Sequence, residues 1–263
     1  MLLFIVPLKS KESSSSWPLT CQLLERCLRS ICNQTDPHFK VLVVCNKKPE
    51  IPYSHPQIEY LEVSLKIPKT YEEKSFDKSK KTILGLVYSQ KFSVDHVMIV
   101  DADDCVSNRI TAFVNNHTDA NGWILKNGYI YKENDLVMRH ERLRFNQLCG
   151  SCNILKFELW PLPESKEKFS DELIYFYSGF NHGNIKDFFK DKGKNLEVLP
   201  FPGVIYVIGN GENIYQNDFS KINGSHQGKF LFHVKQLRKI RPLLPSARQE
   251  FGLYAIPEKL NRV

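Results

Sequence analysis

The sequence has no run approaching the roughly 20 consecutive apolar residues that a membrane-spanning helix needs. Residues 1–8 are apolar, but this run is too short, and too lacking in a leading positive region, to be a signal peptide. We therefore expect a buried strand over residues 2–6, which Pro7 ends because proline cannot donate to a ladder. The expected location is cytoplasmic, with peripheral contact at the inner face of a membrane as a further hypothesis.

Glycine and cysteine motifs that mark common binding sites are also scarce. No GxGxxG follows the first expected strand, which disfavours a dinucleotide-binding fold of the usual kind. The seven cysteines are an odd number scattered along the chain, as expected for buried free thiols in a reducing compartment. Cys149 and Cys152 have CxxC spacing, but no second pair lies near them to complete a zinc site.

The excess of positive charge is moderate. With 36 basic and 29 acidic residues the formal net charge is +7, which fits an anionic ligand such as a nucleotide, or loose contact with an anionic membrane surface. The excess is too small to argue for nucleic acid, and neither an arginine-rich recognition helix nor an aromatic-rich RNA motif is present. We expect no nucleic-acid partner.

The most informative stretch is VMIVDADD, residues 97–104. Its four apolar residues predict a strand buried on both faces, and Asp101, Asp103 and Asp104 follow where that strand surfaces. In an open α/β sheet, ligands bind outside the carboxyl ends of the strands. Packed carboxylates repel one another unless a cation or a shared proton holds them, and hard oxygen ligands suit Mg²⁺ or Mn²⁺. The alternative is a polar strand end that caps the next helix.

The order of elements predicts an α/β fold. The first half alternates strands and helices, which implies a mostly parallel sheet with right-handed crossovers. Its expected elements are strands over 2–6, 39–45, 58–65 and 97–100, a helix over 17–34, and a helix that follows the lysine-rich segment 74–81 and ends near Phe92. The second half is expected to contain a strand or hairpin over 122–131, strands over 150–155 and within 196–208, and helices over 108–116, 166–178 and 185–192.

Five features, in this order, resemble family-2-type glycosyltransferases of the GT-A fold. They are the first strand closing on Pro7, the helix closing on SICNQ at 30–34, the strand FKVLVVC, the segment 77–81, and the motif DAD at 101–103. The segments GWILKNGYIY and PFPGVIYVIGNGEN resemble a bacterial branch of this family. The resemblance runs over nearly the whole chain. It implies one GT-A-like domain, 1–263, with a nucleotide-sugar-binding half at 1–104 and an acceptor-side half and basic tail at 105–263.

The resemblance also implies a reaction. A hexosyltransferase of this type, acting in polysaccharide biosynthesis, moves a sugar from a nucleotide-diphosphate sugar to a glycan or lipid-linked acceptor. Mn²⁺ or Mg²⁺ neutralises the diphosphate as the glycosidic bond breaks. By similarity Asp103 ligates the metal, Asp101 contacts the ribose or shares the metal, and Asp104 is a spare carboxylate or a helix cap.

Other parts of the donor site follow from the same resemblance. Lys81 and Lys78 are expected near the diphosphate with Asp77 orienting one of them, although Lys78 is interpreted in the first place as part of a solvated helix face. Pro7 and Lys9 line the base pocket, and Gly150 and Ser151 form the floor under the sugar. Where the family usually has an acidic residue that reads a uracil-like base, this chain has Asn46.

The acceptor side needs a general base to take the proton of the attacking hydroxyl, because the reaction is expected to invert. Asp171 and Glu172 are candidates, but Ser170-Asp-Glu is also a normal helix start. His182 is the other candidate, either as the base or as a further metal ligand.

Two hypotheses concern apolar side chains. Trp123 and Trp160 could stack on a sugar ring, or could pack in the core. Residues 230–248 combine apolar residues with Lys235, Arg238, Lys239, Arg241 and Arg248. This tail could rest on an anionic membrane that delivers a lipid-linked acceptor; the alternative is a charged helix or loop that closes the domain.

Two rival functions stay open. A nucleotidyltransferase would share the sheet and the metal, but would want a glycine- and lysine-rich loop after the first strand, where this chain has serines and Trp17. A non-catalytic nucleotide- or sugar-binding protein of the same fold could lose the metal site, which the intact DAD motif disfavours.

Overall fold

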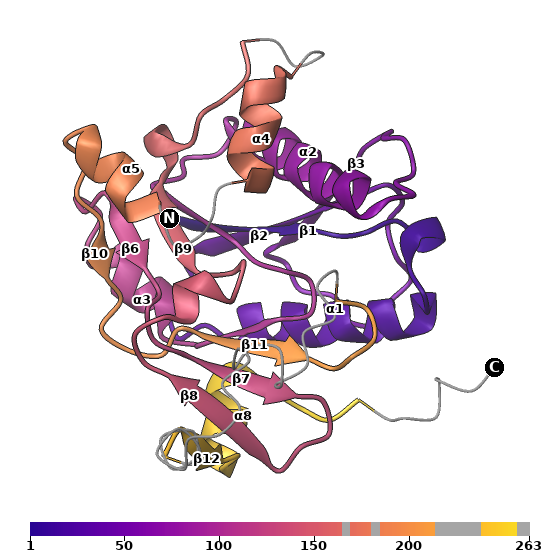
Figure 1. Ribbon diagram of the computed structural model, residues 1–263, viewed down its shortest axis with the longest axis vertical. Coiled ribbons are helices and arrows are strands. Elements are labelled where there is room, and N and C mark those ends of the chain that lie inside the picture. Colours follow the sequence, from indigo (N-terminus) through magenta and orange to yellow (C-terminus); the bar gives the residue numbers. More distant parts are fainter. Residues whose placement is uncertain (165–168, 180–184, 214–237, 257–263) are drawn as a thin grey trace, which may run out of the picture.

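The computed structural model describes residues 1–164, 169–179, 185–213 and 238–256, and two β-sheets form its framework (Figure 1). The larger sheet has seven strands in the order β10-β6-β9-β4-β1-β2-β3. Their bounds, in that order, are Glu197–Val198, Gly122–Ile124, Asn153–Lys156, His96–Ile99, Leu2–Pro7, Phe39–Cys45 and Ile58–Glu62. β1 pairs in parallel with β2 and β4, and β2 with β3, whereas β9 runs antiparallel to β4 and β6. The predicted fold class, a mixed and mostly parallel sheet flanked by helices, is confirmed.

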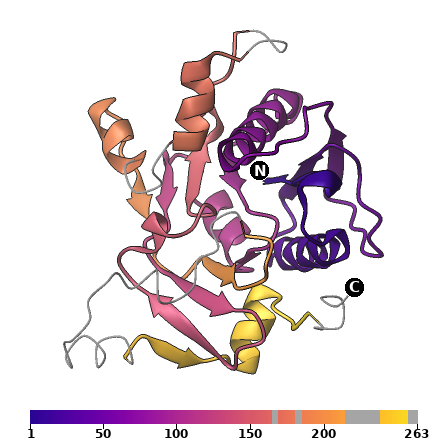
Figure 2. The ribbon, with the colours of Figure 1, turned by 45° about the vertical axis from the view of Figure 1, so that its right-hand side comes forward.

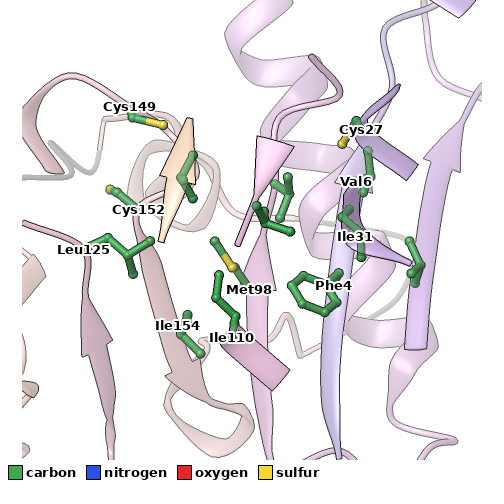
Figure 3. Packing of buried hydrophobic residues seen from close by; sticks show 14 of the residues in the cluster. Phe4, Val6, Cys27, Ile31, Met98, Ile110, Leu125, Cys149, Cys152 and Ile154 are labelled. Carbon is green, nitrogen blue, oxygen red and sulfur yellow. The ribbon is translucent and has the colours of Figure 1, made fainter. Parts of the chain in front are cut away.

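Helices cover both faces of this sheet. Leu2, Phe4 and Val6 of β1 share a core cluster with residues of α1 (Trp17–Ile31), and Figure 3 shows Phe4 and Val6 beside Cys27 and Ile31. Leu3 and Ile5 point to the opposite side and pack in a cluster with residues of α2 (Tyr71–Ser89) and α5 (Ile185–Asp191). The uninterrupted apolar run of β1 therefore reflects burial on both faces, since side chains alternate along a strand.

The smaller sheet has five strands in the order β12-β8-β7-β11-β5. Their bounds are Ile240–Pro242, Val137–Glu141, Gly128–Lys132, Val204–Ile208 and Cys105–Val106. Alternate residues of β11 face two different cores, because Val204 and Ile208 join the cluster around α1, while Ile205 and Val207 pack with Phe251 of α8 (Pro245–Phe251). Figure 2 shows α8, in yellow, beside the strands of this sheet. The sequence did not predict a second sheet.

Two further α-helices, α3 and α4, complete the set in the described part of the chain. α3 (Ile110–Asn115) follows β5, and α4 (Asp171–Gly179) packs on α2, with the rings of Phe76 and Tyr175 5.4 Å apart. Single-turn 3-10 helices also occur at Lys11–Ser13, Phe145–Gln147 and Phe157–Leu159. None of the helices in the described ranges is long and apolar enough to cross a membrane.

Two sequence predictions need correction. The hairpin over 122–131 is wrong, because β6 and β7 belong to different sheets and the Asn127-Gly128 turn carries the chain from one to the other. The lysine-rich segment 74–81 does not precede a helix but lies inside α2. Thr70 is the N-cap of α2 and forms a capping box: Glu73 N–H donates to the Thr70 hydroxyl, and the Glu73 carboxylate accepts from Thr70 N–H. The break at Pro200 and Pro202 is confirmed, since β10 ends before it and β11 begins after it. The division of the chain into two functional halves stays a prediction.

Candidate active site

A cavity of about 600 Å³ opens at the ends of β1 and β4. Pro7 and Lys9 line it from the end of β1, and Asp101 and Asp103 line it from the loop after β4. Because β1 and β4 are neighbouring parallel strands, their carboxyl ends meet at one edge of the sheet. The volume lies within the roughly 300–1,000 Å³ typical of small-molecule sites. The cavity therefore occupies the position expected for a ligand crevice.

Asp101 forms an ion pair inside this cavity. Lys78, on α2, places its Nζ against Asp101 Oδ1, and both side chains line the cavity. Burial disfavours the ammonium charge, but the Asp101 carboxylate outweighs it and raises the pKa of Lys78. The interpretation of Lys78 as part of a solvated helix face is wrong, because α2 turns this residue toward β4.

Gly150 leaves the room that this ion pair needs. A Cβ atom at Gly150 would lie 2.5 Å from Asp101 Oδ2 and 3.0 Å from Lys78 Nζ. Gly150 lines the cavity, as expected for a floor residue, but the group that a side chain would meet is the Asp101 carboxylate.

Asp103 is held from the loop that follows β11. Its Oδ2 accepts hydrogen bonds from Asn210 Nδ2 at 2.9 Å and from Asn213 Nδ2 at 2.8 Å. Burial raises the pKa of Asp103, and the nearby Asp101 carboxylate raises it further. A positive charge between Asp101 and Asp103 would relieve this repulsion.

Asp104 is fully buried and has a structural position. It accepts hydrogen bonds from the Ser151 hydroxyl at 2.7 Å, from Cys149 Sγ at 3.3 Å, and from Val207 N–H of β11 at 3.2 Å. The Ser151 hydroxyl also accepts from Asp101 N–H at 2.8 Å, so Ser151 links the two aspartates. The hypothesis that Asp104 caps a helix is wrong, since α3 begins only at Ile110. Ser151 is itself fully buried, and its contacts are to this loop.

Lys81 lies one turn of α2 beyond Lys78, but its surroundings differ. It is fully buried, and its Nζ donates to Asp77 Oδ2 at 2.7 Å and to the Leu8 carbonyl at 2.8 Å. Burial lowers the pKa of Lys81, although Asp77 opposes this shift. The expected pairing of Asp77 with one lysine is present, and it ties α2 to the end of β1.

Of the residues expected to contact the base, Lys9 lines the cavity and Asn46 does not. Lys9 Nζ donates to Glu212 Oε2 at 2.8 Å at the cavity wall, and Glu212 also accepts from the backbone N–H groups of Ser15 and Ser16 before α1. Asn46 does not line this cavity; its Nδ2 donates to the Leu65 carbonyl at 3.1 Å.

The sequence analysis assigned no role in the site to residues 210–213. Glu212 and Asn213 line the cavity, and Asn210 and Asn213 bond to Asp103, because this loop directly follows the buried strand β11. The signal was the one that identified Asp101 and Asp103, namely polar residues at the end of an apolar run.

The acidic candidates for the general base lie elsewhere. Asp171 and Glu172 are exposed at the first turn of α4 and do not line the cavity. Ser170 precedes them and accepts a hydrogen bond from Leu173 N–H through its hydroxyl, at 3.2 Å. The predicted helix start is therefore confirmed for this pair, and the role of Asp171 or Glu172 as the base stays a prediction. His182, the other candidate for the base and for a metal ligand, lies outside the described residues.

The two tryptophans have different positions. Trp123 is fully buried in the main core, 5.4 Å from the ring of Phe113, so the core-packing alternative holds for it. Trp160 lines the cavity and stacks on Tyr177, with ring centroids 5.9 Å apart and planes within 10°. An aromatic wall thus lies on the side of the cavity that α4 covers.

The carboxylates that line the cavity could supply some, but not all, of the ligands of a divalent cation. Within the described ranges, no group of three His, Cys, Asp or Glu side chains converges on one point. Asp101 and Asp103 nevertheless bring two half-buried carboxylates to the same cavity. Mg²⁺ in proteins is commonly bound by one or two carboxylates together with substrate phosphates. These two residues fit such a cation, which would be completed by a phosphate-bearing ligand.

No protein-family model and no curated protein matches the chain. Among solved structures, it is similar to S. aureus TarS 1-349 in complex with UDP-GlcNAc, at a TM-score of 0.47 and 14% identity, over 94% of this chain and 69% of that chain. For another crystal structure of TarS 1-349 the TM-score is 0.46 at 14% identity, over 78% of this chain and 60% of that chain. It is also similar to Francisella tularensis 2-C-methyl-D-erythritol 4-phosphate cytidylyltransferase (IspD), at a TM-score of 0.41 and 12% identity, over 78% of this chain and 89% of that chain. The chain thus spans 69% of the TarS structure with UDP-GlcNAc and 60% of the other one.

Proposed function

We propose that this chain is a glycosyltransferase that moves a sugar from a nucleotide-diphosphate sugar to a glycan or lipid-linked acceptor. One observation carries the proposal. Two carboxylates, Asp101 and Asp103, and one ammonium, Lys78, converge in a cavity of about 600 Å³ at the carboxyl ends of adjacent parallel strands. The sequence resemblance extends the proposal to the inverting, family-2 type.

The charges of the cavity suit a diphosphate and its counter-ion. Asp101 and Asp103 would hold Mn²⁺ or Mg²⁺, which supplies a Lewis acid that stabilises the diphosphate as leaving group. Lys78 is the side chain that responds to the ligand, because its Nζ already lies beside Asp101 and lines the cavity. Lys78 would donate from its ammonium to a phosphoryl oxygen of the diphosphate, and Asp101 would help to hold the cation.

The surrounding residues keep these groups in place. Ser151 fixes the backbone of Asp101, and Asn210 and Asn213 fix the carboxylate of Asp103. Such preorganisation avoids the cost of reorienting the charges when the bond breaks. Trp160 supplies an apolar wall against which a sugar ring can pack. His182 stays a prediction as the base that takes the acceptor proton.

Nucleotide titration by calorimetry, with and without Mn²⁺, tests the proposal. A glycosyltransferase should bind a nucleoside diphosphate more tightly with the metal and should slowly hydrolyse its donor sugar. Preference for a triphosphate would indicate the nucleotidyltransferase alternative, and binding without metal dependence would indicate a non-catalytic module.

Asp103→Asn is the matched variant for this test. The amide keeps the shape and can still accept from the two asparagines, but it loses the charge that holds a cation. We expect the Mn²⁺-dependent part of the affinity to disappear while the melting temperature is retained. Asp119→Asn, at an exposed position away from the cavity, is the control. If Asp103→Asn binds like the control, the assignment of Asp103 to the metal is wrong.

A further inference from the structure

The outer edge of the smaller sheet gathers exposed apolar side chains. β12 is the terminal strand of that sheet and pairs antiparallel with β8, at the bottom of Figure 1. Five of the nine large apolar side chains that are exposed in the described part lie in these two strands or within two residues of them. They are Leu136 (82% exposed), Leu143 (75%), Leu244 (53%), Ile240 (43%) and Val137 (41%). Since single exposed apolar residues are normal but clusters are not, this edge marks an interaction surface.

The same edge is strongly basic. Arg142, Arg144 and Arg238 are exposed, and Lys239 and Arg241 are half-buried. Glu141 is the one carboxylate in the sequences of β8 and β12, and it is buried. It is already paired, with Lys239 Nζ at 2.7 Å and Arg139 Nη2 at 3.2 Å. The positive charge of the edge is therefore not balanced within these two strands.

We propose that this surface, which we call the edge surface and define by the five apolar and five basic residues just named, binds an anionic lipid bilayer. Leu136 and Leu143 flank the two ends of β8, whose five residues span about 17 Å at ~3.3 Å per residue, so the surface is elongated along this strand. Peripheral proteins are held on such bilayers by two kinds of contact. Basic side chains lie at the level of the lipid headgroups, and apolar side chains enter the boundary between headgroups and acyl chains.

A second copy of the chain fits this edge less well. An exposed edge strand can pair with another strand, but β12 contains Pro242, which has no N–H to donate. Arg241 Nη1 also donates to the carbonyls of Arg238 and Ile240, both at 2.7 Å, and so occupies acceptors that a partner strand would need. A symmetric dimer through this edge would in addition bring like charges together.

The edge surface is connected to the cavity. Arg144 is followed directly by the turn Phe145–Gln147, and Gln147 and Leu148 line the cavity. If the proposed function holds, a lipid-linked acceptor in the bilayer would meet the cavity past this turn. The lipid contact itself does not depend on that function.

Vesicle co-sedimentation of the full chain tests the proposal without any activity assay. The vesicles are phosphatidylcholine alone, or phosphatidylcholine with phosphatidylglycerol, at low and at high salt. We expect recovery with the anionic vesicles to exceed recovery with the neutral ones and to fall as salt rises, because surface charges are screened. Equal recovery with both vesicles at low salt would overturn the proposal.

Two double variants separate the contribution of the basic residues to vesicle binding from that of the apolar residues. Arg142→Glu with Arg238→Glu should weaken binding to anionic vesicles by at least about 25-fold, at roughly fivefold for each basic residue lost. Leu136→Ser with Leu143→Ser should weaken it by roughly tenfold for each leucine. The control is Lys47→Glu with Lys194→Glu, which changes the net charge equally at exposed positions away from the edge surface.

The variants also separate lipid binding from self-association. If the control weakens binding as much as Arg142→Glu with Arg238→Glu, net charge alone is responsible and the edge surface is not the site. If vesicles recover no protein, but sedimentation velocity shows an oligomer that Leu136→Ser with Leu143→Ser abolishes, the edge joins two copies and the lipid proposal is wrong.

Discussion

Gly150→Ala is a sharp perturbation of the cavity. The backbone at Gly150 lies outside the left-handed region, so alanine is not excluded by its own conformation. Its Cβ would, however, lie 2.5 Å from Asp101 Oδ2, whereas an ordinary contact begins at 3.4 Å. The carboxylate must therefore shift by about 0.9 Å, and Lys78 must shift by less, since its Nζ would be 3.0 Å away.

The expected effect falls on binding much more than on stability. The atoms that must move are the ends of two side chains, and Gly→Ala at a compatible position stabilises by about 0.4–1 kcal/mol. We therefore expect the free energy of unfolding to change by no more than about 1 kcal/mol. Displacing a group in or next to a metal site typically costs 10–100-fold in metal affinity, and we expect a loss of about that size in Mn²⁺-dependent nucleotide binding.

Calorimetric titration with a nucleoside diphosphate and Mn²⁺, together with urea unfolding, measures both quantities. Gly193→Ala is the control, because its φ of +70° strains alanine while no atom lies within 4 Å of the new Cβ. That variant should lose about 1 kcal/mol of stability and keep its affinity. A Gly150→Ala protein that binds with unchanged affinity would refute the placement of Asp101 in the binding geometry.

Two further predictions concern ion pairs outside the cavity. Arg26 is fully buried and donates to both carboxylate oxygens of Glu133, at 2.8 and 2.9 Å. Glu133→Gln would leave Arg26 as an uncompensated buried charge, so it should lower the free energy of unfolding by about 3–5 kcal/mol in urea titration. A loss below about 1 kcal/mol would contradict this. Burial opposes the charge of Glu59, but hydrogen bonds from Tyr88 and two lysines outweigh it and lower the pKa of Glu59 from 4.5 to about 2. The ionised group therefore stabilises the fold above about pH 4.5 and loses this contribution as pH falls through about 2, so Glu59→Gln should be less stable than the native chain at pH 7 and approach it between pH 4.5 and 2. A stability difference that stays constant over that range would show that the charge of Glu59 is not responsible.

The central strands could be predicted because their signals are local. Unbroken apolar runs such as FIV in β1 and VLVV in β2 occur where both faces of a strand are covered. The position of Asp101 and Asp103 followed from the same reasoning, since the chain must surface where such a run ends. Sequence periodicity was sufficient for these elements because each residue's environment depends mainly on its place within its own strand.

The smaller sheet could not be predicted in this way. β5 and β12 have two and three residues, too short for any periodic signal. β7 pairs in parallel with β11, more than 70 residues later, so its partner is not specified by the turn at Asn127-Gly128 that suggested a local hairpin. Long-range pairing of this kind is decided by which apolar faces remain uncovered once the larger sheet has formed.

The sequence by itself determined the class of fold and the place of the acidic loop at the end of β4. Only the tertiary structure distinguished the three aspartates, which are nearly adjacent in the chain. Asp101 pairs with Lys78, Asp103 bonds to the loop after β11, and Asp104 bonds to Ser151. It also separated Lys78 from Lys81, one turn apart on α2. The physical reason is that the ionisation and role of a side chain depend on burial and on the charges that face it, and those charges come from distant segments that no local pattern records.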